Sequence, residues 1–162
     1  MTDDTGRHPA RQGRTESPEE RSDRNWNELL QELRVLQTGV QILTGFLLIL
    51  PFQSRFADLD LFQRNVYLAD VLVCLVTSGL FIAPVAVHRG LFRRQLKTEV
   101  VTLGDRMTRT GLVLLAIALS ATALLIFDVV LGRVQGLVVG GAVAVMLLGL
   151  WAVLPVVVRR RP

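Results

Sequence analysis

Four long apolar stretches separated by charged segments dominate this sequence. They cover about residues 35–52, 66–87, 111–131 and 134–158. At 1.5 Å per residue, a helix of about 20 such residues crosses the hydrocarbon core of a bilayer. A soluble amphipathic helix would instead keep charged side chains along its wet face. The pattern therefore predicts an all-α fold, an integral membrane four-helix bundle, in one membrane domain over residues 17–162.

The first apolar stretch continues a pattern that begins in a charged segment. Capping signals at Ser17-Pro18-Glu19-Glu20 and at Asn25 with Glu28 offer two possible helix starts. Large apolar side chains then recur at alternating spacings of three and four, which favours one long helix extended into the cytoplasm. This seam consists of Trp26, Leu29, Leu33, Leu36, Val40, Leu43, Leu47 and Leu50.

The other side of this helix is more polar than lipid would favour. Gln31, Arg34, Thr38, Gln41 and Gly45 recur there at the same spacings. Amide and hydroxyl groups within a membrane pack best against other helices, where they find hydrogen-bond partners. We therefore expect the polar side chains of the first membrane helix to be buried against partners.

Short connections and basic residues predict the topology. Gly132-Arg133 leaves room only for a tight turn, so the third and fourth spans form an antiparallel hairpin. Basic residues concentrate in the tail, in linker 88–110 and at positions 159–161, which favours a cytoplasmic location for all three. An even number of spans also puts both termini on one side. We predict an N-in, C-in protein whose linker extends the flanking helices or, alternatively, forms an interfacial helix.

Composition narrows the function classes. The net charge of +4 comes from basic residues that flank apolar stretches, which indicates contact with lipid headgroups and no nucleic acid partner. Residues 1–16 are polar and are predicted to be disordered, without the apolar core of a signal peptide. One cysteine, Cys74, and two histidines form no metal or cofactor motif, and no catalytic motif is present. We predict no enzyme activity, no cofactor and no metal.

Two carboxylates lie inside the spans and are the first candidate sites. An ionisable residue within a membrane helix is a functional hypothesis by default. Asp70 lies early in its helix, where the macrodipole favours a negative charge. Asp128 lies late in its helix, where the dipole opposes a negative charge, so it must be protonated, paired or in contact with water, and Arg133 and Arg64 are the available partners. Structural pairing and ion or proton handling both remain open.

Two further sets of residues complete the candidates. Gln37, Gln41 and Thr44 of the first span could line a polar path or form hydrogen bonds between helices. In the last span, small residues recur every four positions and form a ridge that allows another helix to approach closely, within the bundle or between subunits. This ridge comprises Gly132, Gly136, Gly140 and Ala144.

Several local motifs resemble a known group of proteins. They are residues 24–34 (RNWNELLQELR), Gln37 to Gln41, Leu50-Pro51-Phe52, Tyr67-Leu68, Ala83-Pro84-Val85, His88-Arg89 and Leu91-Phe92-Arg93. From about residue 24 onward the chain resembles an uncharacterised actinobacterial family of small four-helix membrane proteins. Some relatives carry an automatic sodium:proton antiporter label. The resemblance implies the same fold and a multi-pass location in a bacterial plasma membrane.

The sequence leaves two hypotheses about function. The first is a non-enzymatic packing or interaction module of the bilayer that associates with itself or with a membrane partner through the apolar seam and the small-residue ridge. The alternative is a small proton- or cation-coupled transporter that uses Asp128 and Asp70 with the glutamines of the first helix. Every polar residue named above has a structural explanation, which favours the module.

Overall fold

The computed structural model describes residues 18–91 and 97–153, and four long helices account for most of them. They are α1 (Pro18–Ile49), α2 (Leu61–Leu91), α3 (Lys97–Leu131) and α4 (Arg133–Leu148). Short 3-10 turns η1 (Leu50–Phe52) and η2 (Ser54–Asp58) join α1 to α2, and a π-helical turn η3 (Gly149–Val153) extends α4. The predicted disordered tail, residues 1–16, lies outside the described residues, as do the last five residues of the fourth predicted span.

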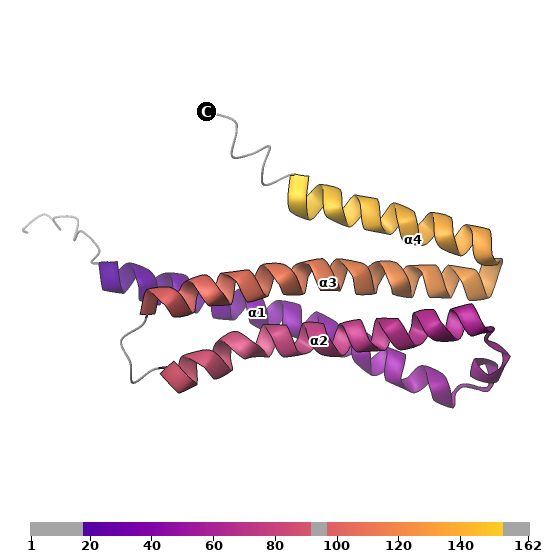
Figure 1. The fold of residues 1–162 in the computed structure, drawn as a ribbon, viewed down its shortest axis with the longest axis horizontal. Coiled ribbons are helices and arrows are strands. Elements are labelled where there is room, and N and C mark those ends of the chain that lie inside the picture. Colours follow the sequence, from indigo (N-terminus) through magenta and orange to yellow (C-terminus); the bar gives the residue numbers. More distant parts are fainter. Residues whose placement is uncertain (1–17, 92–96, 154–162) are drawn as a thin grey trace, which may run out of the picture.

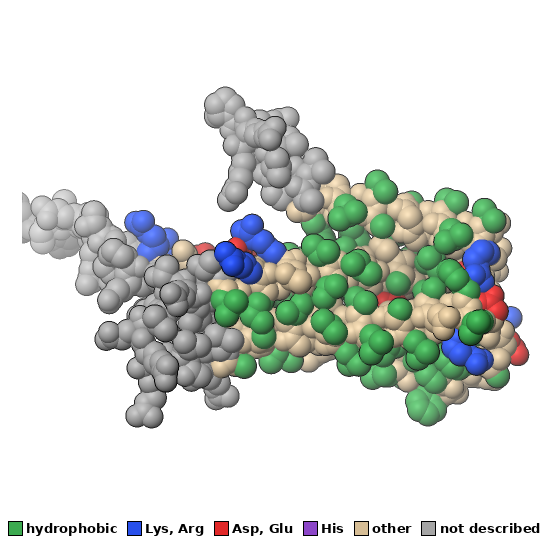
Figure 2. All heavy atoms as spheres, in the orientation of Figure 1, with side chains coloured by type: hydrophobic (Ala, Val, Ile, Leu, Met, Phe, Trp, Pro, Cys, Tyr) green, Lys and Arg blue, Asp and Glu red, His purple; other side chains and the backbone are tan. Residues whose placement is uncertain are grey.

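All four helices are long and apolar enough to cross a membrane. The apolar ranges are Asn27–Phe52, Leu61–Ala86, Leu103–Leu131 and Arg133–Trp151. Figure 2 shows hydrophobic side chains over the middle of the visible face and charged side chains toward its two ends. The prediction of an all-α chain with four apolar helices is therefore confirmed.

The helices run up and down, with α3 at the centre of the arrangement (Figure 1). The closest helix pairs are α2 with α3 and α3 with α4, and α1 packs mainly on α2. Among the described elements, the backbone of α4 lies close only to α3 and η3, and Arg133 at its start also reaches Phe62 of α2. In the described part of the chain, α1 and α4 therefore do not contact each other, and α3 lies between them.

The apolar seam of α1 packs inside the chain. Its middle residues, Leu33, Val40 and Leu47, are buried, whereas Leu50 is exposed where the helix ends. The seam joins two apolar clusters with α2 and α3. One contains Leu47, Tyr67, Cys74, Ala118 and Leu125, and the other contains Leu33, Val40, Phe81 and Leu115. Burial of α1 thus follows the spacing of three and four predicted for a helix with one apolar side.

Close contacts fix the antiparallel register of α2 and α3. A Cβ atom on Gly111 would lie 2.4 Å from Cε1 of Phe81, so glycine is required for the aromatic ring to fit.

Toward the other end of α2, the Tyr67 hydroxyl donates to the carbonyl of Leu47 at 3.1 Å. The ring of Phe56 meets that of Tyr67 edge to face, with centroids 5.0 Å apart. These contacts hold the η1–η2 connection against the bundle.

The remaining connections differ in length. Only Gly132 separates α3 from α4, and its φ of +105° is one that side chains rarely allow. Its N–H donates to the carbonyl of Asp128 at 2.9 Å, which closes the last turn of α3. On the opposite side of the molecule, α2 continues to Leu91 and α3 begins at Lys97. Residues 92–96 of the predicted linker lie outside the described part.

Candidate functional site

A reciprocal cap begins α2 and starts the first candidate site. The Asp60 carboxylate accepts from the N–H of Gln63 at 2.8 Å, and the Gln63 side-chain oxygen accepts from the N–H of Asp60 at 3.0 Å. This is a capping box, with an acidic residue at the cap and an amide three residues later. It fixes the side chain of Gln63 at the end of α2 nearest the α3–α4 turn.

Asp128 lies against this cap and is almost fully enclosed. Its side chain is 3% exposed, and Nε2 of Gln63 donates to Oδ1 at 3.2 Å. Nε of Arg133 lies 2.9 Å from Oδ2. That N–H is not aligned as a hydrogen bond, so the attraction is that of an ion pair. Arg133 is therefore the partner that Asp128 has in the fold.

Arg133 joins three helix ends. Its guanidinium also donates to the carboxylate of Asp60, and it stacks 3.8 Å from the centroid of the Phe62 ring. Planar guanidinium groups suit such combined ion-pair and aromatic contacts. Asp60, Phe62, Gln63, Asp128 and Arg133 form a cluster that we call the polar clasp. It connects the start of α2, the end of α3 and the start of α4.

Asp70 occupies a separate and deeper place between α2 and α3. It is 1% exposed, and the Thr122 hydroxyl donates to Oδ2 at 2.6 Å. The Cys74 thiol lies 3.9 Å from Oδ1, a weak contact, and no cation pairs with Asp70 within the described residues. Asp70 stands seven residues after Gln63, about 10 Å farther along α2. The two aspartates therefore belong to different sites.

The polar residues of α1 do not form one path. The Thr44 hydroxyl is buried, donates to the carbonyl of Val40 at 2.7 Å and lies beside the Cys74 thiol. Gln37 is half-buried and Gln41 is exposed, and neither side chain forms a hydrogen bond within the described part of the chain. The structure thus places Thr44 beside Cys74, which also contacts Asp70, but leaves Gln41 on the outer surface.

The small-residue ridge packs α4 against α3. A Cβ atom on Gly136 would lie 2.7 Å from Cβ of Asp128 and 2.8 Å from its backbone nitrogen. One on Gly140 would lie 2.7 Å from Cβ of Leu124. Gly132 forms the turn, and Ala144 is half-buried. Of the two locations that the sequence left open, within the bundle or between subunits, the structure shows the first.

Sequence reasoning missed the cap that completes the polar clasp. Its signal is present in Asp60-Leu61-Phe62-Gln63, because an acidic cap residue followed three positions later by glutamine is typical of a helix start. The contact of Thr122 with Asp70 has no comparable local signal. It depends on the register of two helices whose contacting residues lie 52 positions apart.

The two sites differ in what they can do chemically. In the polar clasp each charge has an opposite charge beside it, which suits a structural joint. Asp70 is a carboxyl group with hydrogen-bond donors and, among the described residues, no cation, which suits either a structural hydrogen bond or exchange of a proton. No group of three or more histidine, cysteine, aspartate or glutamate residues among the described positions could hold a metal ion.

Comparison with known proteins gives a single finding. The model of a family described as "Family of unknown function (DUF6328)" matches residues 15–155. The match covers all four apolar helices, with Asp70 and Asp128. No curated protein and no solved structure is significantly similar to the chain.

Proposed function

Because this chain belongs to the DUF6328 family, whose function is unknown, we propose a role from its own structure. The protein is a multi-pass protein of the bacterial plasma membrane with both termini in the cytoplasm. It works as a non-enzymatic interaction module that associates through its membrane helices. Four apolar helices support the membrane location, and an uncovered polar side of α1 supports the association.

The proposed orientation rests on the distribution of basic residues. Linker 88–110 and positions 159–161 are rich in arginine, whereas Arg55, Arg64 and Arg133 are the basic residues of the opposite connections. Arg133 is also engaged by Asp60 and Asp128. The positive-inside rule therefore assigns the linker and both termini to the cytoplasm.

Cysteine labelling tests this orientation. In a Cys74→Ala background, an impermeant thiol reagent added outside intact cells should modify Ser54→Cys and not Thr98→Cys, because the η1–η2 connection would face outward and the start of α3 would face the cytoplasm. Permeabilised cells should show labelling at both positions, which controls for reactivity. Labelling of Thr98→Cys alone in intact cells would reverse the orientation.

The observation that carries the interaction module is the outer side of α1. Gln41 lies near the middle of the apolar range Asn27–Phe52, yet its side chain is exposed and forms no hydrogen bond within the described residues. Thr38 is also exposed, and a Cβ atom on Gly45 would meet nothing within 4 Å. An unsatisfied amide facing hydrocarbon is costly, and small neighbours allow another helix to approach. We call Arg34, Thr38, Gln41 and Gly45 the α1 polar side.

The sequence predicted two other surfaces for association, and both are buried in contacts within the chain. The apolar seam packs on α2 and α3, and the small-residue ridge packs α4 on α3. The α1 polar side is therefore the surface left for a partner. A second copy of the chain fits it, because a glutamine amide is both donor and acceptor and can pair with its own symmetry mate.

Substitution of Gln41 tests self-association. We expect Gln41→Leu to weaken the dimer about 3- to 30-fold, which corresponds to about 0.6–2 kcal/mol for a hydrogen bond between membrane helices. Phe46→Leu is the matched control, because Phe46 is 68% exposed on a different side of α1. Sedimentation in detergent or energy transfer in liposomes measures the affinity. A wild-type protein that is monomeric at all protein-to-lipid ratios contradicts the proposed partner.

A small proton- or cation-coupled transporter is the second candidate, and one observation favours it. Asp70 is buried between two membrane helices and has no cation beside it in the part of the chain that the structure describes, as a carboxyl group that exchanges a proton would be. Asp128 is less suited, because Arg133 neutralises it. If transport occurs, Asp70 is the residue that would carry it.

Flux in proteoliposomes decides between the two candidates. For an interaction module we expect no proton or sodium flux from the purified wild-type protein under either gradient. We also expect Asp70→Asn to retain the fold, because the amide oxygen still accepts from Thr122. Wild-type flux that disappears in a folded Asp70→Asn variant would establish the transporter instead.

A further inference from the structure

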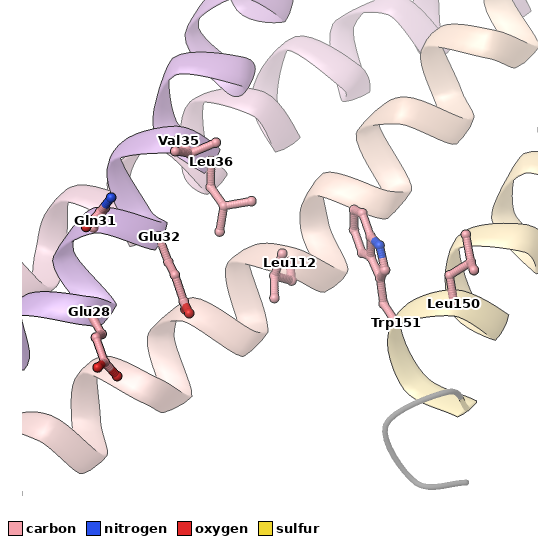
Figure 3. Close-up of a pocket in the computed structure, with 8 residues that line it drawn as sticks. All are labelled: Glu28, Gln31, Glu32, Val35, Leu36, Leu112, Leu150 and Trp151. Carbon is pink, nitrogen blue, oxygen red and sulfur yellow. The ribbon is translucent and has the colours of Figure 1, made fainter. Parts of the chain in front are cut away.

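A groove of about 790 Å³ opens between α1 and η3, with α3 as its floor. Figure 3 shows Glu28 and Glu32 on α1 at one side and Trp151 on η3 at the other, with Leu112 of α3 between them. The groove exists because α4 packs on α3 and not on α1. Gln31 lines the groove where it borders the α1 polar side, but the two carboxylates lie on a different side of α1, since Glu32 and Arg34 are two residues, about 200°, apart around the helix.

The two ends of the groove differ in polarity. Its membrane end is apolar, with Leu36, Leu112 and Trp151 in the wall. Its other end carries the carboxylates of Glu28 and Glu32. Arg24 approaches Glu28 only to 3.8 Å in an exposed pair, and Glu32 has no ion pair among the described residues. The groove therefore suits an occupant that joins an apolar stretch to positive charge.

The chain itself contains such an occupant immediately after the wall of the groove. Residues 156–161 read Val-Val-Val-Arg-Arg-Arg and lie beyond the described part, which ends at Val153. Because α1 and α4 are antiparallel (Figure 1), η3 ends on the side of the molecule where α1 begins, which is also the side of the acidic end of the groove. In this segment the valines come first and the arginines follow. In the groove the apolar end lies next to Trp151 and the acidic end lies beyond it, so the two orders match.

The lengths also agree. Glu28 stands eight residues before Leu36, about 12 Å along α1 at 1.5 Å per residue. Arg159 stands eight residues after Trp151, a reach of about 12 Å if helical and about 26 Å if extended. A helical segment matches only the distance along α1 and has no length left to cross from η3 to α1, so the arginines reach the two carboxylates in the extended conformation.

We propose that the C-terminal segment 156–161 of the chain docks in this groove. The valines cover the apolar wall, and the three arginines pair with Glu28 and Glu32. Docking closes the gap between α1 and the end of α4. A lipid ammonium headgroup has the same charge, but the segment is tethered beside the groove, which gives it an effective concentration in the millimolar range for a short linker. The proposal does not depend on self-association of the chain.

Disulfide crosslinking of the full-length protein tests the proposal. In a Cys74→Ala background, Glu32→Cys with Pro162→Cys keeps Glu28 and all three arginines. We expect an intrachain crosslink with at least about fivefold higher yield than Arg34→Cys with Pro162→Cys, whose α1 thiol lies on the opposite side of the helix. Raising the salt from about 0.1 to 1 M shortens the Debye length from about 10 to 3 Å and should lower the yield.

Charge variants separate the possible outcomes. Changing the three arginines to glutamine in the same pair should reduce the crosslink to the level of the control. Reversing both sides, with Glu28→Arg and the three arginines changed to glutamate, should restore it even if either reversal alone impairs folding. A crosslink between chains, equal yields from both α1 positions, or yields unaffected by the arginine changes would each overturn the proposal. Loss of the crosslink when anionic lipid replaces neutral lipid would do so too, because it would place the arginines on headgroups.

Discussion

Replacing Gly136 by leucine is expected to detach α4 from α3 and to lower the free energy of unfolding by at least about 1–3 kcal/mol. The first added atom, Cβ, would already lie 2.7 Å from Cβ of Asp128 and 2.8 Å from the carbonyl oxygen of Leu124. Two of the atoms within 3 Å belong to the α3 backbone, which cannot rotate away as a flexible side chain would. The helices must therefore separate, and the polar clasp at their ends would be strained as well.

Val138→Leu is the control for this prediction. Val138 is 64% exposed on the other side of α4, so a larger apolar side chain there should change stability by no more than about 0.5 kcal/mol. Unfolding by SDS titration or by heating in detergent measures both variants, and Gly136→Ala should fall between them. Equal stability of the leucine variants at 136 and 138 would mean that the ridge does not hold α4 on α3.

Replacing Arg133 by glutamine should destabilise the protein more than replacing Asp128 by asparagine. Without Arg133, the Asp128 side chain keeps a charge that is 3% exposed and has lost its neutralising partner. Removing one member of a buried pair costs about 3–5 kcal/mol, and we expect about 3 because Arg133 is 37% exposed. In Asp128→Asn, the amide oxygen still accepts from Gln63, and Arg133 keeps Asp60. This variant should therefore lose about 1 kcal/mol or less.

The double variant completes the comparison. Arg133→Gln with Asp128→Asn removes both charges, so it should be more stable than Arg133→Gln alone, and the two changes should be non-additive. SDS titration of the four proteins gives the coupling energy. Additive changes would show that the two residues act independently, despite their separation of 2.9 Å.

Local patterns in the sequence predicted most of the fold. The apolar stretches gave four helices, because a helix that crosses a bilayer must be apolar over its length. The spacing of Leu33, Val40 and Leu47 indicated the side of α1 that is buried, since residues three and four apart share one side of a helix. Gly132 next to Arg133 indicated the tight turn between α3 and α4. Each of these features depends only on residues close together in the chain.

The candidate site was predicted only in part for the same reason. The residue types and their positions in the helices identified Asp70 and Asp128 as the carboxyl groups that need partners. Arg133, five residues from Asp128, could be named as one partner because it follows the same turn. Thr122 and Gln63 could not be named, because their contacts cross between α2 and α3.

The sequence alone determined that this protein has four apolar helices, which side of α1 is buried and where the chain turns. The tertiary structure decided which helices are neighbours. It packed Gly136 against α3, left Gln41 exposed without a hydrogen bond to any described residue, and opened the groove between α1 and η3. The physical reason is that helical periodicity specifies the side of a helix that must be covered, but not the helix that covers it. That choice depends on how closely two backbones can approach, and at Gly111 and Gly136 the absence of a single Cβ atom allows the approach.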